Sequence, residues 1–216
     1  MITDFSTTSV RSLTACNAGF GNIIITLPGS KDTLFFVRNS KWVPTVTMSF
    51  DSKDGPTLGV LKLGFFKWST ITAELGDANP YAIPFHWTKL DKVSWWTHSR
   101  HQFSFTNGRD RRIYEWVTTK RPFFGDQPDL ILVQKGAYGD PPGRSEVLAV
   151  YKRHKRPFRS KRGTFHIRQG IWGDGFDDDL LNTWDNWELM VLLTGCGLIE
   201  ASRQRMRRRR NRIPGF

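Results

Sequence analysis

Short segments with the hydrophobic pattern of β-strands follow one another through most of the chain. In residues 45–50, Val46 and Met48 alternate with hydroxyl side chains, which places the two sets on opposite faces of a strand. Turn signals such as Asn107-Gly108 separate the segments and favour antiparallel hairpins. Segments of this kind predict strands at residues 22–27, 33–37, 45–50, 58–63, 68–75, 101–105, 112–117, 130–134, 147–151 and 164–168.

Two stretches lack a clear strand pattern. Residues 1–20 are rich in Ser and Thr without regular alternation, and we expect a flexible N-terminal lead or a loosely attached strand there. Pro80 and Pro84 interrupt residues 76–95, where we expect a long connection with exposed backbone.

The C-terminal part of the chain carries the pattern of one apolar helix. Leu189–Ile199 contains no charged residue and is hydrophobic in every direction around a helix axis, so protein or lipid must enclose it. Asp185 and Glu188 have the spacing of a capping box at its start. The uncharged run spans roughly 16 Å, whereas a bilayer's hydrocarbon core is about 30 Å thick. Enclosure by protein is therefore favoured, and no transmembrane span is expected.

One architecture satisfies both patterns, because the strands can bury their apolar faces against the helix that they enclose. The two patterns predict a mainly β fold, in which an antiparallel, closed β-barrel is wrapped around a central hydrophobic C-terminal helix. Gly195 and Gly197 within the helix would let neighbouring backbone approach closely.

Composition adds expectations about compartment and charge. The two cysteines, Cys16 and Cys196, are far apart, and the N-terminus lacks the basic and apolar regions of a signal peptide. We therefore expect an intracellular protein, cytoplasmic or nuclear, with peripheral membrane attachment left open. The net charge is +12, and residues 203–216 supply seven Arg and no acid, which leaves 12 − 7 = +5 for the rest. This concentration indicates an anionic partner or a solubilising tail.

Residues 185–200 read DNWELMVLLTGCGLIE and resemble the C-terminal helix of the tubby C-terminal-like superfamily, which includes the LURP-one-related proteins and the phospholipid scramblases. Scramblases have a similar run of an acid, apolar residues, Gly, a small residue and Cys, followed by apolar residues and an acid. The segments Phe103-Ser104-Phe105 and Tyr114-Glu115-Trp116 are similar to small fungal members. The resemblance implies a barrel of about twelve strands at residues 21–205, with its central helix at about 185–205, between the lead and an Arg-rich tail at residues 206–216.

The resemblance implies more than one function. Tubby domains bind phosphoinositides, and scramblases move lipids in response to calcium, so the fold alone does not choose between activities. We expect a non-enzymatic intracellular module that binds anionic ligands such as phosphoinositide headgroups. Two alternatives stay open, namely a membrane-associated scramblase-like protein and a nucleic-acid-binding protein that uses the Arg-rich stretches.

Two basic clusters are the candidate sites for anions. The first holds seven Lys or Arg in residues 152–162, between two predicted strands, and could gather phosphate oxygens, although a solvated hairpin loop would look the same. The second consists of the seven arginines between Arg203 and Arg212, which could bind acidic lipid, nucleic acid or a nuclear import receptor, or simply solubilise the helix end. Because strands hold the first cluster at both ends, headgroup selectivity is assigned to it. The residues to which we assign it are Arg153, Lys155, Arg156, Arg159, Lys161 and Arg162.

No pattern in the sequence predicts catalysis, a cofactor or a metal site. The acids Asp174 and Asp177–Asp179 precede the helix without the spacing of an EF-hand loop. His98 and His101 have no nearby cysteines to complete a zinc site. Motifs for nucleotide phosphates, for a nucleophilic Ser and for zinc peptidases are missing from the sequence.

Overall fold

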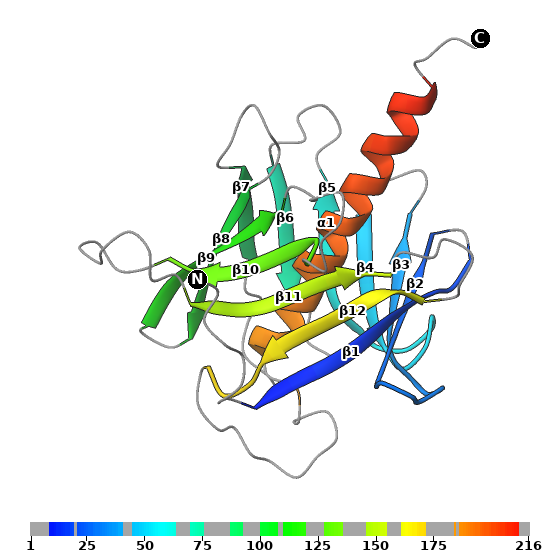
Figure 1. Ribbon diagram of the computed structural model, residues 1–216, viewed down its shortest axis with the longest axis horizontal. Helices are drawn as coiled ribbons and strands as arrows, with labels where there is room; N and C mark the ends of the chain where they lie inside the picture. The colour runs from blue at the N-terminus through cyan, green and yellow to red at the C-terminus, as the bar shows by residue number, and fades with distance from the viewer. Residues whose placement is uncertain are drawn as a thin grey trace.

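Figure 1 shows the computed structural model, in which β-strands surround one long helix. The structure describes residues 9–19, 21–40, 45–63, 70–75, 87–92, 100–107, 110–119, 128–135, 146–154, 161–171, 184 and 186–211. Within these residues the chain forms twelve strands and one helix. The strands are β1 (Val10–Asn17), β2 (Ile23–Thr26), β3 (Thr33–Asn39), β4 (Thr45–Phe50), β5 (Thr57–Leu63), β6 (Thr70–Leu75), β7 (Trp87–Lys92), β8 (Arg100–Asn107), β9 (Asp110–Thr118), β10 (Leu130–Gln134), β11 (Val147–Arg153) and β12 (Lys161–Arg168), and the helix is α1 (Asn186–Asn211).

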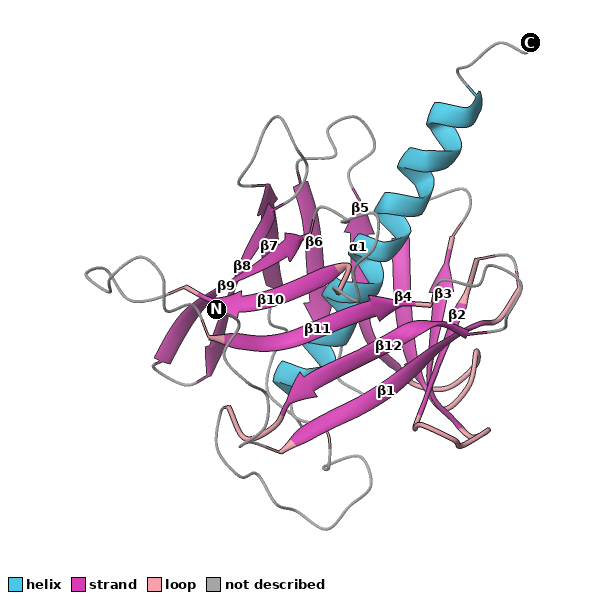
Figure 2. Ribbon diagram, in the orientation of Figure 1, coloured by secondary structure: helices cyan, strands magenta, loops and turns pink. Residues whose placement is uncertain are grey.

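The strands pair in chain order, and the first strand also pairs with the last. Every described ladder is antiparallel, and β1 lies between β2 and β12, so the strand order returns on itself as a closed barrel. The β1–β12 ladder is long, running from the pair Val10 and Arg168 to the pair Cys16 and Lys161. Because successive strands alternate in direction, their ends gather at two ends of the barrel. We call the one where the C-terminal part of α1 leaves the strands the helix-exit end (Figure 2).

Helix α1 passes through the space between the strands and fills it. Met190, Val191, Leu192 and Leu193 are successive residues that point in different directions, yet each is 0% exposed. Burial on all sides accounts for a helix that has no polar stripe, since an apolar side chain contributes about 1.5–3 kcal/mol when it is fully buried. The apolar run predicted from the sequence is therefore the centre of the core.

Strand side chains pack closely against the helix at its two glycines, Gly195 and Gly197. A Cβ on Gly195 would lie 2.8 Å from Phe165 Cε1 of β12, and a Cβ on Gly197 would lie 2.6 Å from Leu61 Cδ1 of β5. Both glycines thus provide close approach, but side chains occupy the space rather than the backbone that we predicted. The reason is that alternate strand residues point inward and separate the strand backbone from the helix.

An ion pair fixes the N-terminal part of α1 to the barrel. Arg11 of β1 donates to Glu188 across 2.9 Å, and its guanidinium lies 4.1 Å from the centre of the Trp184 ring. Glu188 lies in the first turn of α1, where a carboxylate also complements the helix dipole. The predicted N-cap, Asp185, lies outside the described residues.

The prediction of a mainly β, antiparallel fold with one C-terminal helix is confirmed. Each of the predicted strand segments overlaps a strand, and the predictions for 45–50 and 130–134 agree with β4 and β10 at both ends. Of the two alternatives for the N-terminal residues, the strand is the one found at residues 10–17, which form β1 and pair on both sides. The expectation of a connection throughout residues 76–95 is wrong, because residues 87–92 form β7.

The physical reason is that neither strand shows a strong alternation. In β1 the inward residues include the small Ala15, and the sequence around it is rich in hydroxyl side chains that look like those of a loop. β7 reads WTKLDK, in which Leu90 is a single aliphatic residue among charged ones. Both strands form because their backbone groups are hydrogen-bonded to the neighbouring strands on either side. A weak hydrophobic pattern in the sequence does not predict this pairing.

The helix is also longer than predicted. We expected it to end near residue 205 with a tail from 206, but α1 continues to Asn211. Arginine is a good helix former, and cations at the C-terminal end complement the helix dipole. Residues 206–211 therefore belong to the helix rather than to a tail, and residues 212–216 lie outside the described part.

Candidate anion-binding site

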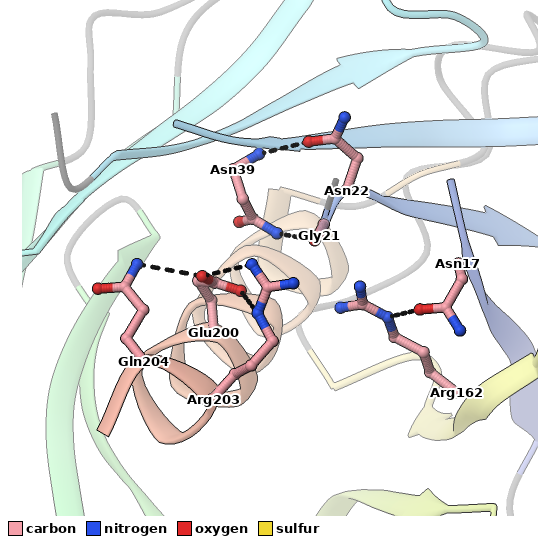
Figure 3. Close-up of polar contacts among 8 residues, drawn as sticks. All are labelled: Asn17, Gly21, Asn22, Asn39, Arg162, Glu200, Arg203 and Gln204. Carbon is pink, nitrogen blue, oxygen red and sulfur yellow. Dashed lines mark hydrogen bonds and ion pairs between the residues drawn. The ribbon is translucent and has the colours of Figure 1, made fainter. Parts of the chain in front are cut away.

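Two arginines from different elements lie close together at the helix-exit end of the barrel. Arg162 comes from the start of β12 and Arg203 from α1, and Figure 3 shows both side chains extending into the same region. The positive charge of Arg203 lowers the pKa of the Arg162 guanidinium, second to the effect of burial. The fold therefore holds two like charges near each other in a partly buried place.

A bulge between β1 and β12 accounts for the position of Arg162. Ala15 is opposite Gly163 and Cys16 is opposite Lys161, so Arg162 is an extra residue without a direct partner on β1. Bulges re-aim side chains and are common beside functional sites. The Arg162 Nε donates a short hydrogen bond to Asn17 Oδ1, which anchors the side chain on the last residue of β1.

Arg203 is held by its own helix. Its Nη2 donates to Glu200 Oε1 at 2.8 Å and its Nε lies 2.7 Å from Glu200 Oε2, while Gln204 Nε2 donates to the same carboxylate at 3.1 Å. The residues are three and four positions apart, which places them on one side of the helix. Glu200 is 2% exposed, so this ion pair is largely shielded from water.

The Arg203 guanidinium lies against the backbone of Gly21, in the connection between β1 and β2. A Cβ built on Gly21 would overlap the Arg203 guanidinium, and Gly21 has a φ of +98°, which glycine adopts most readily. Asn39 donates its backbone N–H to Asn22 Oδ1 at 3.0 Å and its side-chain N–H to the Gly21 carbonyl. These bonds fix the Gly21 backbone against which the guanidinium lies.

The charges of the site do not cancel. One carboxylate, Glu200, stands against two guanidinium groups, and at Arg162 the charge of Arg203 lowers the pKa more than the charge of Glu200 raises it. Burial is the largest cause that lowers the pKa of Arg162, because a partly desolvated cation lacks full hydration. An anion placed between the two guanidinium groups would be attracted by both positive charges.

The other residues predicted to bind the headgroup lie in different surroundings or outside the described part of the chain. Arg153, the last residue of β11, donates its backbone N–H to Asp129 Oδ2 at 2.8 Å, and its Nε lies 3.8 Å from Asp129 Oδ1. Its charge is thus already partly compensated. Lys161 begins β12 opposite Cys16, and its side chain is not among those described. Lys155, Arg156 and Arg159 lie outside the described residues.

The other sequence candidates are placed only in part. His101 lies on β8 and is 4% exposed, whereas His98 and the acids Asp174 and Asp177–Asp179 lie outside the described residues. Among the described side chains, no three His, Cys, Asp or Glu are grouped so that they could hold a metal ion. No helix in the described part of the chain has the length and apolar character needed to cross a membrane.

Three members of the site were not predicted as functional. Asn17 and Gly21 carry no charge, and their proximity to Arg162 and Arg203 depends on how β1 and β2 meet the helix. Glu200 could have been found, because its spacing from Arg203 and Gln204 is the helical spacing of an intrahelical pair.

Comparisons with known proteins add no relative: no family model, curated protein or solved structure matches this chain.

Proposed function

We propose that the protein is a non-enzymatic module that binds phosphorylated headgroups, such as those of phosphoinositides, at the helix-exit end of its barrel. The observation that supports the proposal is the convergence of Arg162 and Arg203, which come from a strand and from the central helix, with Glu200 offsetting one charge. Guanidinium groups suit phosphate because their planar N–H groups can contact two oxygens at once.

Preorganisation favours a site whose side chains the fold already holds in place. Asn17 holds Arg162, Glu200 holds Arg203, and Gly21 lies against the Arg203 guanidinium. A ligand that meets side chains already in place loses less entropy on binding. We therefore move the principal role in headgroup selectivity to Arg162 together with Arg203, and we assign a smaller role to Arg153 because Asp129 already faces it.

The scramblase-like alternative requires the apolar part of α1 to meet lipid. Leu192 and Leu193 are 0% exposed, and strand side chains such as Phe165 and Leu61 lie against the helix glycines. Exposing this stretch would break the core, so the headgroup-binding alternative is the one we retain.

The test measures headgroup affinity by calorimetry with soluble inositol trisphosphate and by co-sedimentation with vesicles. The vesicles contain phosphatidylcholine with either a phosphoinositide or phosphatidylserine at equal total charge. We expect Arg162→Gln to weaken binding of the trisphosphate and of phosphoinositide vesicles about tenfold, which corresponds to about 1.4 kcal/mol. The ratio of the affinity for phosphoinositide vesicles to the affinity for phosphatidylserine vesicles should decrease as well.

Matched variants separate the site from general charge. Arg111→Gln removes the same charge from an exposed position of β9 near its turn with β8, and it should leave binding unchanged. Arg203→Gln must be combined with Glu200→Gln, because a buried carboxylate without its partner would destabilise the fold. Equal affinities of Arg162→Gln and Arg111→Gln would refute the proposed site. Competition by inorganic phosphate at the same concentration as the trisphosphate would show a general phosphate site instead.

A further inference from the structure

The C-terminal end of α1 extends beyond the core that encloses the rest of the helix. Ala201 is 3% exposed and is the last buried residue among the side chains of α1 that the structure describes, but the helix continues to Asn211. The ten residues 202–211 correspond to a helical length of about 15 Å at 1.5 Å per residue. Figure 1 shows this segment, at the red end of the colour scale, emerging from the strands at the helix-exit end.

Arginine positions surround this segment. Its sequence is SRQRMRRRRN, in which Met206 is the single hydrophobic residue. With about 100° of rotation per residue, the five arginine positions from 205 to 210 fall near 0°, 200°, 300°, 40° and 140° around the axis. Gaps between neighbouring arginine positions are therefore no wider than about 100°. The segment has no apolar face.

The absence of an apolar face in this sequence decides between two kinds of anionic partner. A helix that lies on a membrane buries an apolar face among the lipid chains and keeps its cations on the other side. A helix that is basic all round instead suits a groove with phosphates on both of its walls. The major groove of B-form DNA is about 12 Å wide, and an α-helix with side chains is about 10–12 Å across.

We propose that the projecting end of α1, residues 202–211, inserts into the major groove of duplex DNA and contacts the phosphates of both strands. Its arginine positions are distributed around the helix axis, so phosphates on either wall can be contacted, and such contacts are electrostatic and largely independent of base sequence. The narrow, deep major groove of duplex RNA would exclude the helix. The segment shares Arg203 with the headgroup site, but the arginines at positions 207–210 lie further along α1 than Arg203, so the two sites can be changed separately.

The barrel contributes by holding the helix in place. Arg203, near the start of the projection, pairs with Glu200, and the residues from Leu189 to Ala201 are enclosed in the core. A helix that is already formed and anchored avoids the ordering cost of a disordered basic tail that folds on binding. The proposal therefore requires both the charge and the helical backbone of this segment.

The experiment uses the full chain and measures fluorescence anisotropy with a labelled 20-bp DNA duplex at 50–200 mM salt. The first variant carries R207Q, R208Q, R209Q and R210Q. If the four arginines neutralise four phosphates, the slope of log K against log salt should decrease in magnitude by about 3.6, at about 0.9 per contact. The Arg→Lys variant at the same positions should keep most of the slope, and R162Q should bind the duplex as the unmodified protein does.

A second variant separates helical presentation from charge. Met206→Pro interrupts the helix within the projection and leaves every arginine in place. We expect at least a fivefold loss of DNA affinity while the melting temperature of the barrel stays within a few degrees.

Equal binding by Met206→Pro and the unmodified chain would refute a preformed groove-binding helix, as would unchanged DNA binding by the four-Gln variant. Equal or stronger binding to duplex RNA, or to phosphatidylserine vesicles, would also overturn the proposal. Because R162Q and the four-Gln variant address different surfaces, failure here leaves the headgroup proposal standing, and the reverse holds too.

Discussion

A buried hydrogen bond between strand and helix offers a direct test of the enclosed position of α1. Trp116 Nε1 of β9 donates to Thr194 Oγ1 at 2.9 Å, and Thr194 Oγ1 in turn donates to the Met190 carbonyl at 2.7 Å. Both Trp116 and Thr194 are 0% exposed, so water cannot replace either partner in the folded protein. The substitution Thr194→Val removes the acceptor and preserves the shape and volume of the side chain.

The expected loss of stability follows from the unsatisfied indole. A buried donor left without an acceptor costs about 1–3 kcal/mol, and an isosteric valine leaves no cavity to add to that figure. For a chain of this length, about 1 kcal/mol shifts the melting temperature by roughly 2–4 °C, so the midpoint should fall by roughly 2–12 °C. Thermal and urea unfolding followed by circular dichroism would measure the change, with an unchanged urea m-value as a sign that the fold is retained.

Two controls isolate the hydrogen bond from the change of residue type. Thr118→Val makes the same chemical change at an exposed position of β9 and should shift the midpoint very little. In a Trp116→Phe background the indole donor is gone, so Thr194→Val should cost less than in the unmodified protein. If Thr194→Val cost the same in both backgrounds, or no more than Thr118→Val, the strand would not be bonded to the helix as described.

Two further outcomes follow from the same packing. Gly21→Ala should destabilise the protein and weaken headgroup binding more than Gly19→Ala, because both glycines have positive φ but only the Cβ at Gly21 would meet Arg203; equal effects in melting and binding measurements would contradict this contact. Cys196 is 0% exposed and burial raises its pKa to about 12, whereas Cys16 is partly exposed, so an aromatic disulfide reagent at pH 8 should label Cys16 in the folded protein and Cys196 only in denaturant. A Cys16→Ser variant that still reacted quickly when folded would show that the core around Cys196 opens.

Local pattern determined those elements whose environment is uniform along their length. Thr45–Phe50 alternates because one face meets the core, and Leu189–Ile199 is apolar throughout because the core surrounds it. Such elements were predictable, since their pattern of burial is regular along the whole element and is visible in the order of apolar and polar residues. The extension of α1 to Asn211 was less apparent, because a run of arginines is compatible with a solvated tail as well as with a helix.

Tertiary structure alone decided the weak strands and the candidate site. β1 and β7 owe their strand conformation to neighbours on both sides, and pairing of this kind leaves little trace in a short polar sequence. Arg162 and Arg203 are separated by forty-one positions, 203 − 162 = 41, and each belongs to a basic stretch that looks like solvated charge. Their meeting depends on a bulge that turns one side chain and on a helix that carries the other through the barrel. Sequence composition reports how many charges a chain has, but only the fold sets the distance and the solvation between two of them, on which their interaction depends.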